Sequence, residues 1–192
     1  KAGAFDIAMG NSRGAEGSSF LLTAGSTTLA TKQGGNVTLN AGVGYGLGGN
    51  GGGLMLGAGL SITGTGGDAT LGSGASLGKG SGHLTLHTVN SGANGMSGNL
   101  DIKTGTTRIG GSGAIRVATG VAISGGAGGS LSFVVGTGSS GQGGSILMRA
   151  GDSSDKSGGN IMVETGWGTT TSSGYMVIKT SNAGTSGISG PM

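Results

Sequence analysis

A short motif recurs along the whole chain, and it constrains the fold more than any other feature. It consists of a glycine, two apolar residues one position apart, a small residue and a second glycine, written G-x-Φ-x-Φ-x-[A/T]-G with Φ apolar. It reads G-N-V-T-L-N-A-G at 35–42, G-N-L-D-I-K-T-G at 98–105 and G-N-I-M-V-E-T-G at 159–166. With one serine allowed for the first glycine, it begins about every 15.5 residues: at Gly3, Ser18, Gly35, Gly52, Gly67, Gly82, Gly98, Gly113, Gly129, Gly144, Gly159 and Gly174. Because so short a repeat cannot bury an apolar face alone, neighbouring repeats are expected to stack.

The eight residues of each motif, called a segment below, have the pattern of a β-strand. Positions 3 and 5 are apolar in nearly every repeat, as in Val37 and Leu39. Alternation at period two indicates a strand with one buried face. Position 7 is small in most repeats, which adds a third inward residue to each strand: Ala24, Ala41, Ala58, Thr104, Ala150, Thr165 and Thr180. The stretches between segments, such as 137–143 and 152–158, are rich in Gly, Ser and Asp and predict turns, and essentially no helix is expected.

These observations predict an all-β fold, a parallel β-solenoid. Two geometries compete. In one, two repeats form a flattened two-sheet coil of about 31 residues, giving about six coils; in the other, each repeat is a small coil of about 15 residues, giving about twelve rungs. Position 4, which points outward, favours the two-sheet coil because it is mostly polar in odd-numbered repeats and largely apolar in even-numbered ones. Such parity is expected if alternate strands belong to different sheets.

The sequence also contains a second, longer repeat, which includes several copies of the short one. Residues 82–98 align with residues 174–190 without a gap, at an offset of 92 residues. We therefore expect residues 1–192 to form a single array of two blocks, each of about 92 residues and six short repeats, and to be an excerpt of a longer array.

The composition excludes several classes of protein. Of 192 residues, 51 are glycine and 9% are charged, unlike an ordinary globular domain. Glycine does not recur at every third position and there is one proline, so collagen is excluded. A hydrophobic fraction of 33% with a net charge of +3 argues against a flexible linker. The scattered charges indicate no nucleic-acid partner, and no apolar run is long enough for a membrane span.

No motif indicates catalysis or a bound cofactor. A G-x-G-x-x-G string at 44–49 is not followed by the helix that a nucleotide site requires, and at this glycine content such strings arise by chance. His83 and His87 lie four residues apart on a predicted strand, about 13 Å, which is too far to share a metal ion. Among the carboxylates only Asp152 and Asp155 are close together. We therefore predict no enzyme, no cofactor, and neither catalytic nor metal-binding residues.

The apolar residues at position 4 of even-numbered repeats are the candidate interaction surface. In a stack they would share one face and form an apolar stripe, which more often marks an interface than a free surface. The alternative is that Gly-rich loops of the same chain cover them. The predicted assembly interface consists of Leu21, Met55, Leu147 and Val177.

Residues 173–190 (S-G-Y-M-V-I-K-T-S-N-A-G-T-S-G-I-S-G) and 128–151 resemble the Gly/Ser/Thr-rich repeat proteins of diatoms and other stramenopile algae. The resemblance covers most of the chain and implies an extracellular or cell-surface location, without implying an active site. A looser likeness, through G-x-Φ-x-Φ-x-A-G alone, is to bacterial haemagglutinin-type β-helix adhesins.

Three functions remain open at this point. The first is a structural protein of an extracellular filament, sheath or fibre, whose partner is the chain itself, end to end and laterally, because the strand edges at the ends of a stack template further pairing. The second is a surface adhesin or glycan-binding module. The third is ice binding, although the outward column is interrupted by Asp6, Leu21 and Met55 and is not a regular row of threonine.

Overall fold

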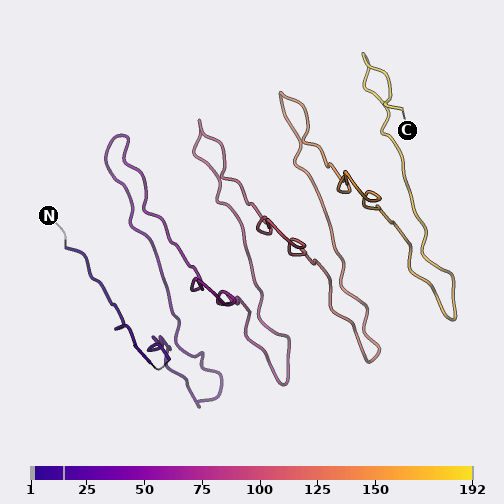
Figure 1. The fold of residues 1–192 in the computed structure, drawn as a ribbon. Coiled ribbons are helices and arrows are strands. Elements are labelled where there is room, and N and C mark those ends of the chain that lie inside the picture. The colour runs from indigo at the N-terminus through magenta and orange to yellow at the C-terminus, as the bar shows by residue number, and fades with distance from the viewer. Residues whose placement is uncertain (1–2, 15, 192) are drawn as a thin grey trace. The chain divides into compact units, whose positions relative to one another are not determined.

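The structure is a computed structural model that describes residues 3–14 and 16–191. Within these residues there is neither an α-helix nor a β-strand, and the ribbon of Figure 1 is drawn without a coil or an arrow. The predicted all-β fold is therefore wrong, both as a two-sheet solenoid and as a one-repeat coil. A strand requires a hydrogen-bonded partner about 4.8 Å away along its length. In the described residues, backbone hydrogen bonds occur only within loops and where loops begin and end.

The chain divides into two units, Lys1–Leu100 and Asp101–Met192. Each unit alternates open segments with turns and bends. The division falls inside the segment 98–105, so both units contain several repeats. The short repeat is therefore a feature of each unit by itself.

The short repeat is visible in the structure as a series of closed loops. At the base of a loop, the N–H of the glycine that begins one segment donates to the carbonyl oxygen of the glycine that ends the previous one. The N···O distances are 2.8 to 2.9 Å in six loops and 3.5 Å in a seventh. We call this contact the latch, and it joins Gly25–Gly35, Gly42–Gly52, Gly59–Gly67, Gly74–Gly82, Gly136–Gly144, Gly151–Gly159 and Gly166–Gly174.

The small residue at position 7 packs against the latch. A Cβ atom placed on Gly35 would lie 3.3 Å from the Cβ of Ala24 and 3.2 Å from the backbone nitrogen of Gly25. On Gly159 it would lie 3.4 Å from the Cβ of Ala150. Position 7 is thus small because the next glycine approaches it closely. The interpretation of this position as a third core residue is wrong.

One loop departs from this pattern, because Val135 occupies position 7 there. A Cβ atom on Gly144 would collide with Cγ1 of Val135, and this is the latch with the longest N···O distance, 3.5 Å. The valine methyl fills the space that an alanine leaves open at the next loop. Thr165, which is also branched at Cβ, precedes a latch of 2.9 Å. The long bond therefore goes with the valine methyl that is directed at Gly144, and not with branching at position 7 alone.

The second residue of each loop organises the turn in one of two main ways. The hydroxyl of Thr27, Ser61, Ser76 or Ser153 accepts a backbone N–H two or three residues further on. In other loops this position is glycine, and a Cβ atom there would lie 2.5 to 2.6 Å from a backbone oxygen across the loop, as at Gly44, Gly138 and Gly168. Local side-chain-to-backbone hydrogen bonds and close backbone approach are the two devices that Ser/Thr and Gly supply in turns.

Candidate assembly surface

The apolar side chains of the segments do not form a core. No residue is buried in the part of the chain that the structure describes, and Leu131, predicted to be inward, is 53% exposed. The accessible surface is 19466 Å². A folded monomer of this mass exposes about 8,000 Å² and its unfolded chain about 26,000 Å². The segments thus present as free surface what a globular protein of this size would bury.

Alternation between the two faces of a segment is nevertheless retained. In the segment that begins at Gly144, Leu147 at position 4 is 86% exposed, whereas Ile146 and Met148 on either side are 58% and 66% exposed. The segments beginning at Ser18, Gly52 and Gly159 show the same order, whereas the segment at Gly174 departs from it. In these four segments the side chains at positions 3 and 5 are therefore more covered than the side chain at position 4.

The four residues of the predicted interface are all exposed. Leu21 and Met55 lie in the first unit and are 85% and 93% exposed. Leu147 and Val177 lie in the second unit, at 86% and 66%. Their placement on one common stripe was inferred from stacked strands, and the structure has no such stack. What remains of the prediction is four accessible apolar side chains, each at position 4 of its segment.

An apolar hollow lies in the second unit beside the weak latch. Phe133, Ile146, Leu147 and Met148 line a cavity of about 390 Å³. These side chains come from the segments 129–136 and 144–151, which are joined by the Gly136–Gly144 latch. Its lining carries no ionisable group, so the hollow suits an apolar occupant.

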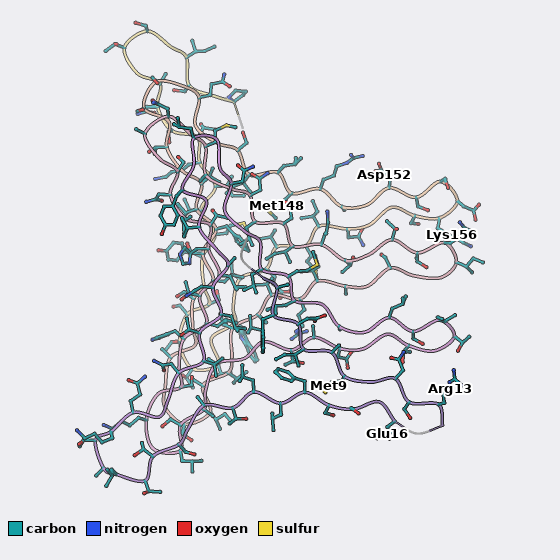
Figure 2. The ribbon with its side chains drawn as sticks, turned by 90° about the vertical axis from the view of Figure 1, so that its left-hand side faces the viewer. Met9, Arg13, Glu16, Met148, Asp152 and Lys156 are labelled. Atoms are coloured by element: carbon teal, nitrogen blue, oxygen red, sulfur yellow. The ribbon has the colours of Figure 1, made fainter. Side chains whose placement is uncertain are left out.

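Charged side chains occur both in loops and in segments, and Arg149 directly follows Met148 of the hollow. Figure 2 shows Met148 in its segment, followed by Asp152 and Lys156 along the loop 151–159, with Lys156 near the far end of that loop. Arg149, in the segment before this loop, forms an ion pair with Asp152, and both side chains are exposed. In the first unit, Arg13 and Glu16 lie near the far end of the loop that follows Met9 (Figure 2). An exposed ion pair contributes little to stability because water screens it.

The structure gives the candidate metal ligands and carboxylates no common site. Over residues 3–14 and 16–191, no group of three or more His, Asp or Glu side chains is placed to hold a metal ion, and His83 and His87 are both exposed. Asp152 pairs with Arg149, whereas the backbone N–H of Asp155 donates to the Ser153 hydroxyl. The same residues contain no helical stretch that could cross a lipid bilayer.

Two structural roles were missed from the sequence, although both left a signal there. The latch follows from glycine at positions 1 and 8 with a small residue at position 7. The hydroxyl or glycine two residues after position 8 recurs from loop to loop and determines the turn.

Comparison with protein-family models, curated proteins and solved structures found no match.

Proposed function

We propose that this chain is a structural repeat protein that assembles with copies of itself into a filament, sheath or fibre. The observation that carries the proposal is the exposure of every apolar segment together with the absence of any buried residue in the described chain. Burying apolar surface stabilises by about 25 cal/mol per Å². Part of the surface in excess of a folded monomer, on the order of 11,000 Å² in total, is apolar, and burial of that part would drive association.

The chain's own copies are the partner that fits this surface best. The same motif recurs in every repeat, so each copy offers many equivalent apolar segments to another. With a net charge of +3, copies repel one another only weakly. Scattered basic residues give no anionic surface a place to bind, and a chain with one tryptophan and two tyrosines has few of the aromatic platforms that glycan sites use.

Within this proposal, Leu21, Met55, Leu147 and Val177 form part of the contact between copies. Leu21, Met55 and Leu147 project from the more open face of their segments and are more than four-fifths exposed, and Val177 is 66% exposed. With this role we propose an extracellular or cell-surface location, because the sequence resembles the algal repeat proteins. The β-solenoid stacking first expected as the mode of assembly is not part of the proposal.

The test measures association of the full chain. Sedimentation velocity over a dilution series and electron microscopy of the concentrated protein should give monomers when dilute and filaments or sheets when concentrated. The variant L21T/M55T/L147T/V177T should shift assembly to higher concentration, since it removes four exposed apolar side chains.

A matched control removes the same number of exposed apolar side chains from the loops. Leu47, Leu77, Ile109 and Ile188 are all at least nine-tenths exposed and lie outside the segments. Their joint replacement by threonine should leave the assembly threshold close to that of the parent. A parent that stays monomeric at every concentration overturns the proposed function, and equal effects of the two quadruple variants overturn the assigned contact.

A further inference from the structure

Between positions 2 and 7, the main chain of the segments has no hydrogen-bonding partner among the described residues of the copy. Among the described residues there are ten backbone–backbone hydrogen bonds, seven of them latches and three inside loops. A globular protein of this length would have about 130, since two-thirds of roughly one bond per residue are backbone–backbone. Side-chain hydrogen bonds to the backbone also fall in the loops. Positions 2 to 7 of the segments thus present free N–H and C=O groups.

The segments also have the conformation and pattern that main-chain pairing needs. Positive φ angles in the described residues occur only in loops, at Gly14, Thr31, Gly48, Gly110 and Gly125. The segments run as open, uncoiled stretches in Figure 1. In the segments that begin at Ser18, Gly52, Gly144 and Gly159, alternate residues are more and less exposed, which is the two-faced character of a strand without a neighbour. Extended stretches with free backbone groups are templates for pairing with another chain.

We propose that segments of one copy pair through their backbone with the equivalent segments of a second copy, so that β-structure forms between copies. This inference rests on the proposed self-association and specifies its mode. Within one copy, a latch joins the two segments of seven consecutive pairs, and the described residues have no latch before Ser18, Gly98, Gly113 or Gly129. Beyond the latch, the backbones of the two segments form no further hydrogen bond in the described chain.

The repeat makes such pairing cooperative and open-ended. Once one segment is paired, the next lies about 15.5 residues further along in both copies, so the following pairings occur at high effective concentration. A shift by one repeat leaves all but the terminal segments paired, and a shift by 92 residues places residues 82–98 beside residues 174–190 with their glycines in register. Staggered pairing of this kind leaves free segments at both ends and adds copies without closing.

The first arm of the test uses the intact chain with and without ¹³C-labelled backbone carbonyls. In the assembled protein the amide I infrared band should have the low frequency of an extended sheet. Diluting labelled copies with unlabelled ones should shift the labelled band, because neighbouring carbonyls then belong to different copies. A low-frequency band that is present in the dilute monomer, or that does not respond to isotopic dilution in the assembly, overturns the inference.

The second arm removes backbone donors while leaving apolar side chains in place. Thr38, Thr85 and Ser132 stand at position 4 of three segments, and T38P/T85P/S132P deletes three N–H groups there. The control S97P/S112P/S140P deletes the same number from loops, at residues whose N–H makes no hydrogen bond in the structure. The segment variant should raise the assembly threshold at least about tenfold, since each copy loses three backbone N–H donors, one in each of three segments. The loop variant should stay near the parent.

The outcomes separate the two proposals. Filaments without an intermolecular band, or a segment variant that assembles as readily as the loop variant, overturn backbone pairing and leave the structural function standing. A parent chain that never assembles overturns both. An isotope-sensitive band with a selective effect of the segment variant supports backbone pairing.

Discussion

Exchanging the side chains at position 7 of two neighbouring repeats should exchange the strengths of their latches. The loops 136–144 and 151–159 span the same number of residues, but Val135 precedes the first and Ala150 the second. Their latches measure 3.5 Å and 2.9 Å. Val135→Ala should allow Gly144 to approach Gly136 as closely as Gly159 approaches Gly151, and Ala150→Val should push Gly159 away.

The size of the effect follows from the hydrogen bond that is gained or lost. A net contribution of about 0.5 to 1.5 kcal/mol for one such bond corresponds to a change of about 2- to 10-fold in the local opening equilibrium. No larger effect is expected from the side chain itself, because Val135 is already 41% exposed and its removal leaves no cavity.

Amide hydrogen exchange of the ¹⁵N-labelled chain, followed by NMR below the assembly threshold, measures both latches in one sample. Val135→Ala should slow exchange at the Gly144 amide, and Ala150→Val should speed exchange at the Gly159 amide. The Gly174 amide, whose latch lies outside both loops, is the internal reference. If Gly144 exchanges at the same rate in both backgrounds, side-chain bulk at position 7 does not control the latch and the explanation of the long bond is wrong.

Three further predictions concern single loops. Ser153→Ala should speed exchange of the Lys156 amide about 2- to 10-fold in the same NMR experiment, because the hydroxyl oxygen that accepts this N–H is lost; an unchanged rate would contradict the role of the second loop residue. Gly138→Ala should displace the backbone of its loop and produce chemical-shift changes throughout it, whereas Gly141→Ala, where a Cβ meets nothing within 4 Å, should change only adjacent signals. Asp152→Asn removes an exposed ion pair and should alter the assembly threshold less than about fivefold, as measured by sedimentation, since such pairs contribute at most about 1 kcal/mol; a larger change would mean that the pair takes part in the contact between copies.

The sequence by itself determined where the chain turns and where it runs extended. Glycine at positions 1 and 8 predicted the repeat boundaries, and in the structure the same glycines form the latches, as at Gly151 and Gly159. The stretches 137–143 and 152–158, predicted as turns, are confirmed as loops. These features are local: a residue's conformational freedom and its hydrogen bonds to near neighbours decide them, so one segment of sequence contains the information.

What covers the apolar residues was decided only by the tertiary structure, and here the prediction of a solenoid failed. Alternation of Leu100 and Ile102 with polar neighbours indicates that one face of a segment avoids water, but the pattern is the same whether the cover comes from the same chain or from another. In the structure both remain more than half exposed. The small residues at position 7 were assigned to a core for the same reason, whereas Ala24 and Ala150 are small because a glycine backbone approaches them. Leu21, Met55, Leu147 and Val177 stay a prediction, since their exposure is compatible with a contact but does not identify its partner. The periodicity of apolar residues indicates that one face of a segment is suited to contact with apolar groups. It does not identify those groups, because they come from residues far apart in the sequence or from another chain.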